Sequence, residues 1–147
     1  MTETTARFAL PYILPGQAQK EVYHNEALAL VDTALHPVAE SLGDDVPPAG
    51  PQPGQCWITG TAPAGEWSGR AGQLAVWTAG GWRFVTPVEG MRVWLRGAGV
   101  HARWTGAAWL SEAAADPAIA DILGGNDARD AINAMLAVMR NHGLIEG

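Results

Sequence analysis

The sequence lacks the features of a membrane-embedded or disulfide-linked protein. It holds one cysteine, Cys56, so no disulfide can form within the chain. No apolar run approaches the roughly 18 residues that indicate a membrane-spanning helix, and the chain opens without a signal-peptide pattern. We therefore expect the protein to be made and folded in the cytoplasm, with no membrane partner.

Basic residues are also scarce. Lys and Arg number 9 against 15 Asp and Glu, which gives a formal net charge of −6 at pH 7. Lys20 is the single lysine, and the arginines are spread along the chain without a cluster. Proteins that bind nucleic acid through a general basic surface carry a patch of cations that neutralises phosphates. We therefore expect no nucleic-acid partner.

Groupings of catalytic or metal-binding residues are missing as well. The histidines are far apart, and none has metal-ligand spacing to another His, Cys or carboxylate: His24, His36, His101 and His142. Cys56 lies on the apolar face of a predicted strand, which indicates a buried and unreactive thiol. No glycine-rich loop has the phosphate-binding order. We expect no enzyme activity, no cofactor and no metal.

Tryptophan, by contrast, is abundant, with 7 in 147 residues. Four of them fall into two copies of one pattern, WTAGGW at residues 77–82 and WTGAAW at residues 104–109. A tight turn at the centre of each copy makes a β-hairpin whose two indoles form a cross-strand pair. Gly106 suits a type II′ turn. Ala79 disfavours positive φ, so the first copy is expected to use a longer or bulged loop that offsets its pair.

A strand-like run precedes each hairpin, at residues 54–59 and 90–96. Alternate residues of the two runs form apolar faces, made by Cys56 and Ile58 and by Met91, Val93 and Leu95. The opposite faces present Trp57 and Trp94 outward. The pattern predicts two three-stranded antiparallel meanders, about six strands in all.

Length and composition predict a single α+β domain over residues 1–147. Its expected parts are an extended arm at 1–16, a helix at 17–38, a Pro- and Gly-rich linker at 43–54, the β-region at 54–111 and a helical tail at 116–145. The first helix has an apolar stripe of Leu28, Val31, Leu35 and Val38. Its first half is polar nearly all round, so those side chains either face solvent or contact another chain.

The helix within the tail is expected from about residue 126 to 141. Its apolar stripe consists of Ile132, Met135, Leu136 and Met139. Such a stripe packs either on the sheet of its own chain or on copies of itself about a symmetry axis. The second arrangement makes Ile132, Met135 and Met139 candidate subunit contacts.

Three tryptophans outside the two pairs are candidates for a binding role. Trp57 and Trp94 lie on outward strand faces, and Trp67 lies in an insertion at residues 62–70. Indoles combine a large apolar face with a polar tip, and Arg92 and Arg96 beside Trp94 can bond hydroxyl or anionic groups. The residues predict a glycan-binding site from Trp57, Trp67, Trp94, Arg92 and Arg96. A subunit contact explains the same pattern, because Trp and Arg are favoured at interfaces.

Several runs resemble an uncharacterised small Trp-rich domain of phage and gene-transfer-agent structural proteins. They are LPYILPGQAQKEVYHNEAL at residues 10–28, WTAGGWRFVTP at 77–87, GMRVW at 90–94 and MRNHGLI at 139–145. The resemblance implies a virion structural protein, a head-spike or tail-fibre component that contributes to attachment to the host cell. It implies a homo-oligomer bound to a capsid or tail protein, made in the bacterial cytoplasm and then part of an extracellular virus-like particle. It implies no catalysis.

In that setting we expect the arm and the polar half of the first helix to contact the particle or neighbouring copies, through Tyr12, Gln17, Gln19, Lys20 and Asn25. The Trp-rich sheet would then project, or hold a further fibre protein. Little sequence follows the second helix, which favours a base or adaptor role over direct host binding. The alternative hypothesis is a carbohydrate-binding module that recognises cell-surface polysaccharide through exposed tryptophans.

Overall fold

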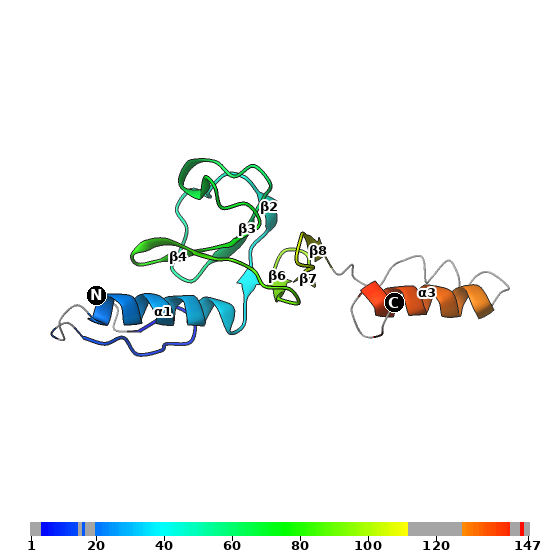
Figure 1. Ribbon diagram of the computed structural model, residues 1–147, viewed down its shortest axis with the longest axis horizontal. Helices are drawn as coiled ribbons and strands as arrows, with labels where there is room; N and C mark the ends of the chain where they lie inside the picture. Colours follow the sequence, from blue (N-terminus) through cyan, green and yellow to red (C-terminus); the bar gives the residue numbers. More distant parts are fainter. Residues whose placement is uncertain (1–3, 15, 17–19, 112–127, 142–144, 146–147) are drawn as a thin grey trace. The chain divides into compact units, whose positions relative to one another are not determined.

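The computed structural model describes residues 4–14, 16, 20–111, 128–141 and 145 (Figure 1). The chain divides into two compact units, Met1–Leu110 and Ser111–Gly147. The described residues form two α-helices and eight strands in two sheets that contain both parallel and antiparallel pairs, so the α+β class is confirmed. Within the described residues, no helix combines the length and apolar character needed to span a bilayer.

The strands belong to two four-stranded sheets. The first has the order β2-β3-β4-β5, with bounds Leu42–Asp44, Cys56–Thr59, Leu74–Thr78 and Gly81–Val85. The second has the order β1-β6-β7-β8, with bounds Val38–Ala39, Arg92–Leu95, Val100–Trp104 and Trp109–Ser111. Antiparallel pairing joins β3, β4 and β5, and likewise β6 and β7. The two runs of three neighbouring strands correspond to the two predicted meanders.

Each sheet also gains a strand that the sequence did not predict. β1 pairs in parallel with β6, and β2 pairs in parallel with β3. These strands occupy positions predicted to end the first helix, at Val38, and to begin the linker, at Gly43. They are 2 and 3 residues long, too short to show an alternating pattern. They are strands because each pairs with a longer neighbouring strand, which is a tertiary contact.

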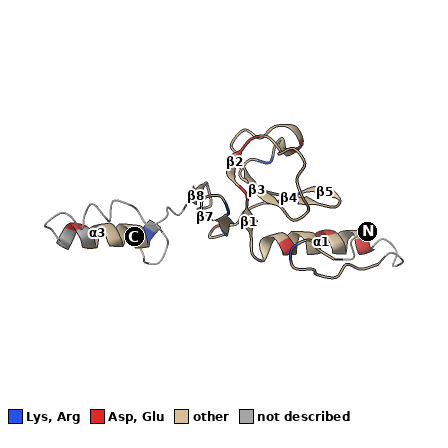
Figure 2. Cartoon of the chain, turned by 180° about the vertical axis from the view of Figure 1, so that it is seen from behind, with Lys and Arg blue, Asp and Glu red and all other residues tan. Residues whose placement is uncertain are grey.

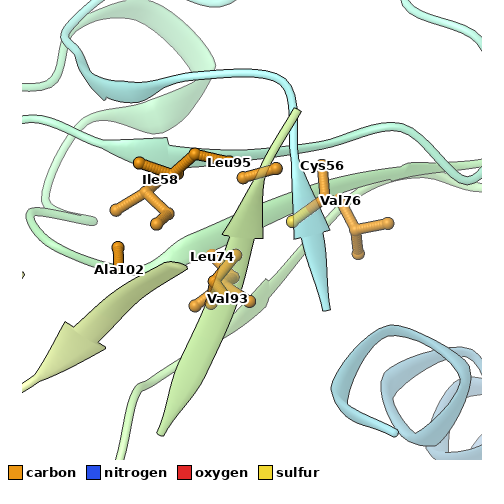
Figure 3. Close-up of a cluster of buried hydrophobic side chains, with 8 residues drawn as sticks. Cys56, Ile58, Leu74, Val76, Val93, Leu95 and Ala102 are labelled. Atoms are coloured by element: carbon orange, nitrogen blue, oxygen red, sulfur yellow. The ribbon is translucent and has the colours of Figure 1, made fainter. Parts of the chain in front are cut away.

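The main core lies between the two sheets (Figure 3). It takes Cys56, Ile58, Leu74 and Val76 from the first sheet, and Ala39, Val93, Leu95 and Ala102 from the second. The predicted apolar faces are confirmed, since Cys56, Ile58 and Val93 are fully buried. Because side chains alternate along a strand, the residues between them lie on the opposite faces.

Both predicted tryptophan pairs are present. Trp77 lies directly opposite Trp82, and their ring centroids are 5.1 Å apart. The rings of Trp104 and Trp109 are 5.5 Å apart. Each hairpin is therefore stabilised by contact between two large aromatic side chains, an interaction that contributes roughly 0.2–1 kcal/mol relative to an alanine pair.

The loop of the first hairpin corrects one expectation. Thr78 pairs directly with Gly81, so the loop is short and the tryptophan pair is not offset. The positive φ of 94° falls on Gly81 and not on Ala79, and glycine adopts this conformation without a steric penalty. The Thr78 hydroxyl donates a hydrogen bond to the Gly81 carbonyl at 2.7 Å, which fixes the turn.

An aromatic cluster covers the other face of the first sheet. Trp57, Ala75 and Trp82 come from the strands, and Trp67 comes from a short 3-10 helix, η1 (Gly65–Trp67), in the insertion. The Trp67 ring is fully buried, 5.1 Å from the ring of Trp82 and 6.4 Å from that of Trp57. The prediction that Trp57 and Trp67 are exposed is wrong, because the insertion folds back over this face.

Helix α1 spans Lys20–Ala34, a shorter range than the predicted 17–38. Residues 17–19 lie outside the described residues. Two members of the predicted apolar stripe, Val31 and Leu35, are exposed, whereas Leu28 and Val38 are half-buried. The buried side chains of this helix are polar instead: Asp32 and Thr33.

The amino-terminal arm explains this burial. The Asp32 carboxylate accepts hydrogen bonds from Thr5 Oγ1 and Phe8 N, both at 2.7 Å, and from Arg7 N at 3.0 Å. The described part of the predicted arm is therefore folded against α1. A buried carboxylate with three donors is satisfied internally, as buried charges generally must be.

In the second unit the structure describes Ser111, helix α3 (Ala128–Asn141) and Ile145. The predicted helix is confirmed from residue 128 onward, whereas residues 126–127 and much of the predicted tail lie outside the described residues. Three members of its apolar stripe are exposed: Ile132, Met135 and Met139. The fourth, Leu136, is half-buried.

Candidate functional site

The outer face of β6 and β7 brings together aromatic and cationic side chains. Val93 and Leu95 point into the core, so the residues that alternate with them on β6, Arg92 and Trp94, lie outside. Strand pairing places Trp94 opposite His101 and Arg92 opposite Arg103. We call these four residues the β6–β7 face. It is a surface on a rigid sheet, which positions side chains more precisely than a loop.

Trp94 is the aromatic centre of this face. Its side chain is 36% exposed, whereas Trp57 and Trp67 are buried. The His101 ring lies edge-on to the indole, with centroids 4.9 Å apart and an interplanar angle of 71°. His101 thus supports one side of the indole and leaves part of the ring system open to solvent. Such an indole can serve as a stacking platform for a flat ligand surface.

The segment that carries the β6–β7 face is positively charged, whereas the whole chain is negatively charged. Residues 90–111 contain Arg92, Arg96 and Arg103 and no Asp or Glu, although the chain has a net charge of −6. Arg96 forms an ion pair with Glu40, with Nε and Oε2 3.3 Å apart. The Nε of Arg103 is buried and has no hydrogen-bond partner in the part of the chain that the structure describes.

The structure gathers some predicted glycan-binding residues and separates others. Arg92, Trp94 and Arg96 lie on β6 or directly after it. Trp57 and Trp67 belong to the buried aromatic cluster of the other sheet. Sequence reasoning missed two members of the face, His101 and Arg103. Both could have been predicted from the hairpin register. Leu95 pairs with Val100 across a short connection, and this pairing places His101 and Arg103 opposite the outward residues of β6.

Of the residues predicted to contact the particle, the structure describes the side chains of Asn25 and Tyr12. The Asn25 side chain accepts a hydrogen bond from Ile13 N at 2.9 Å and donates one to Ile13 O at 3.0 Å. Asn25 therefore holds the arm to α1. Tyr12 is half-buried. Gln17, Gln19 and the Lys20 side chain lie outside the described residues.

Tyr12 borders a pocket of about 370 Å³ between the arm, α1 and the β4–β5 hairpin. Polar residues of the lining include Thr5, Asp32 and Thr33. Their side chains already bond within the protein, Thr5 to Asp32 and Thr33 to the carbonyl of Ala29. Burial, followed by the nearby negative charge of Asp32, raises the pKa of the Tyr12 hydroxyl. Two polar side chains of the lining, Thr5 and Asp32, therefore already serve to hold the arm to α1.

The outward side of α1 presents apolar residues to solvent. Tyr23 is 80% exposed and Leu35 is 63% exposed. Together with Ala27 and Val31, also exposed, they stand four residues apart and so form one row along the helix. Leu35 extends the last turn, since its N–H bonds to Val31 O at 2.9 Å. We call Tyr23, Ala27, Val31 and Leu35 the α1 apolar row.

Acidic residues also lie along α1 (Figure 2). Glu26 forms an ion pair with Arg83 of β5, with Oε1 and Nε 3.0 Å apart. Across the described residues, no group of three or more His, Cys, Asp or Glu side chains could hold a metal ion. The Cys56 thiol, fully buried in the core, has a pKa raised to about 12 by burial.

Comparison with known proteins identifies a family but gives no activity. The family model described as "Protein of unknown function (DUF2793)" matches residues 24–110. The matched segment begins within α1, includes both sheets except Ser111 of β8, and ends at the boundary of the first unit. No curated protein matches the chain.

Proposed function

The chain belongs to the DUF2793 family of proteins of unknown function, and we propose that it is a structural component of a phage-like particle or gene transfer agent. In this proposal it forms the base or adaptor of a head spike or tail fibre and contributes to attachment to the host cell. It acts by binding other proteins and not by catalysis. Its partners are further copies of itself, a capsid or tail protein, and a fibre protein.

The observation that carries this proposal is the α1 apolar row. Large apolar side chains that are exposed together in one row mark a surface used for protein contact. Tyr23 and Leu35 each leave more than half of their side chain in solvent. The arm occupies the opposite, polar side of the helix through Asp32. An assembly partner that covered the row would bury it, as coiled-coil and helix-in-groove contacts do.

Replacement of the row tests the proposal directly. Tyr23→Ser, Val31→Ser and Leu35→Ser, combined in one chain, should leave the sheets folded and reduce incorporation into particles at least tenfold. The loss of three buried contacts at an interface typically exceeds the 1.4 kcal/mol that corresponds to a factor of about ten. Incorporation is measured by quantitative immunoblotting of purified particles against the amount of soluble protein in the producing cells.

A matched control uses apolar residues that are equally exposed elsewhere. Val46 and Val88 are 68% and 65% exposed, and Val46→Ser with Val88→Ser should leave incorporation unchanged. Far-ultraviolet circular dichroism and thermal melting establish that all variants fold. Normal incorporation of the row variant, or no wild-type chain in particles at all, would contradict the proposal.

A second candidate function is binding of cell-surface polysaccharide, and the β6–β7 face favours it. Trp94 is exposed beside His101 on a sheet surface that also carries Arg92 and Arg103. The two functions are compatible, because the α1 apolar row and the β6–β7 face lie on different elements. This candidate expects retention of the protein on host capsular polysaccharide, with loss of retention in Trp94→Ala.

A further inference from the structure

We propose that the pocket between the arm, α1 and the β4–β5 hairpin binds a neutral, hydroxyl-bearing ligand, the terminal sugar unit of a glycan, through Thr4, Tyr12 and Trp77. This site is separate from the β6–β7 face and goes beyond the structural role proposed above. Its volume of about 370 Å³ lies within the range of roughly 300–1,000 Å³ that is typical of small-ligand pockets. A concave site of this size fits the end of a glycan better than the middle of a long chain.

Three polar side chains of the pocket lining are free to bond a ligand. The hydroxyl groups of Thr4 and Tyr12 and the Nε1–H of Trp77 form no hydrogen bond with any residue that the structure describes. Thr4 is exposed, and Tyr12 and Trp77 are half-buried, so each keeps surface that a ligand can reach. The pocket therefore offers two groups that both donate and accept hydrogen bonds and one that only donates.

The charges around the pocket favour a neutral ligand. Asp32 is the charged member of the lining, all of which belongs to the described residues and contains no Lys, Arg or His. An acidic ligand would meet the Asp32 carboxylate without a cation to pair with, in a chain of net charge −6. A cationic ligand is not required, because the carboxylate already accepts hydrogen bonds from Thr5 Oγ1, Arg7 N and Phe8 N.

Both aromatic residues of the lining are held in place by the fold. The Trp77 ring packs against the Trp82 ring, with centroids 5.1 Å apart and an interplanar angle of 66°. Tyr12 precedes Ile13, whose N–H and carbonyl both bond to the Asn25 side chain of α1. Aromatic surface that is positioned before the ligand arrives lowers the entropic cost of binding.

A sugar unit matches this combination of aromatic and hydroxyl groups. Its ring has C–H faces that pack on aromatic side chains, and its hydroxyl groups donate and accept hydrogen bonds. Burial, followed by the negative charge of Asp32, raises the pKa of the Tyr12 hydroxyl, so this group stays protonated at neutral pH and can donate. A wholly apolar ligand would leave the hydroxyls of Thr4 and Tyr12 without partners, which costs binding free energy.

The test titrates the full, isotope-labelled chain with the methyl glycosides of glucose, galactose and mannose and follows the amide signals by NMR. We expect at least one of these sugars to bind with a millimolar dissociation constant and to shift the amide signals of Ala6, Gly54 and Thr78, which line the pocket. The corresponding uronic acid should bind about tenfold more weakly, because its carboxylate is repelled by Asp32. The corresponding 2-amino sugar should bind no more tightly than the neutral sugar.

Each aromatic residue of the pocket has a matched control elsewhere in the chain. Tyr12→Phe removes the hydroxyl and keeps the ring, and it should weaken binding about three- to tenfold, the usual effect of losing one hydrogen bond. Tyr23→Phe removes the same atom from a residue of α1 that is 80% exposed and should leave binding unchanged. Trp77→Phe should weaken binding by a similar factor, whereas Trp94→Phe should leave the shifts at the pocket unchanged. Far-ultraviolet circular dichroism and melting temperature show that each variant is folded, and Tyr12→Phe decides the result if Trp77→Phe is not.

Each other result overturns the inference. If no sugar shifts the pocket amides at high millimolar concentration, the pocket is not a sugar site. Tighter binding of the amino sugar would assign the pocket to a cation held by Asp32. Equal effects of Tyr12→Phe and Tyr23→Phe, or shifts confined to β6 and β7, would place sugar binding outside the pocket. Particle incorporation of the α1 apolar row variants is measured without any sugar, so failure of the sugar site is distinguishable from failure of the structural role.

Discussion

The Cys56 thiol lies in the core between the two sheets with none of its surface exposed, and burial raises its pKa from an ordinary value of 9.0 to about 12. The nearby charge of Arg7 lowers this pKa without reversing the effect of burial. Since the thiolate is the reactive form of cysteine, two effects protect the group: it is covered by protein, and at neutral pH it is protonated.

We therefore expect native protein at pH 8 to resist a thiol reagent such as 5,5′-dithiobis(2-nitrobenzoate), and unfolded protein to react within minutes. The folded-state pKa is the higher one, so the contribution of Cys56 to stability is complete below pH 9 and is lost as the pH rises toward 12. Denaturant titrations across that range measure the loss, with Cys56→Ala as the control. Equal labelling rates for native and unfolded chains would contradict the assignment.

Trp67 and Trp94 show what single residues in a sequence do and do not reveal. The alternation of β6 correctly predicted that Trp94 would be exposed, because its neighbours Val93 and Leu95 are buried on the other face. Trp67, in the insertion, was predicted to be a candidate for an exposed binding role, and it is fully buried. Its burial depends on how the insertion returns to β3 and β4, a tertiary contact that periodicity does not encode.

At the scale of elements, Asp32 determines whether the arm is part of the fold. It accepts hydrogen bonds from the Thr5 hydroxyl and from two backbone N–H groups of the arm, those of Arg7 and Phe8. Arg7 in turn bonds to the carbonyls of Asp32, Thr33 and His36 at the end of α1. The carboxylate is buried, so removal of its charge leaves several donors without an acceptor.

We expect Asp32→Ala to release the arm from α1 and to lower the free energy of unfolding by roughly 2–4 kcal/mol, the usual range for unpairing buried polar groups. Trypsin should then cleave after Arg7, and hydrogen exchange at the Leu10 and Ile13 amides should accelerate. Glu26→Gln, which breaks a more exposed ion pair with Arg83, should cost less than about 1 kcal/mol. Unchanged protease resistance in Asp32→Ala would show that other contacts hold the arm.

The sheets divide into parts that periodicity could predict and parts that it could not. The hairpins with paired tryptophans and the strands β3 and β6 follow from alternation and turn residues. β1 and β2 could not be predicted, since a strand of 2 or 3 residues carries no period and takes its conformation from β6 and β3. The missed members of the candidate site, His101 and Arg103, required the pairing register in addition to the strand itself.

At the scale of the whole molecule, the remaining exposed apolar surface argues for self-association. Ile132, Met135 and Met139 of α3 are exposed within their own unit, and their spacing of three and four residues places them on one side of the helix. Isolated helices shorter than about 12–15 residues are marginal in water, and α3 has 14 residues. Contact between copies would bury this row and stabilise the helix.

We therefore expect light scattering at two concentrations to give a mass that is at least twice 15.5 kDa, the mass of one chain. Ile132→Ser combined with Met135→Ser should shift the mass toward that of the monomer, because each loses an apolar contact of about 1.5–3 kcal/mol on assembly. Ala137→Ser, at an exposed position on the same helix, is the matched control and should keep the wild-type mass. A wild-type mass of 15.5 kDa at both concentrations would exclude stable self-association. If the double variant keeps the mass of the oligomer, the subunit contact does not depend on Ile132 and Met135 of α3. The α1 apolar row would then be the next surface to replace.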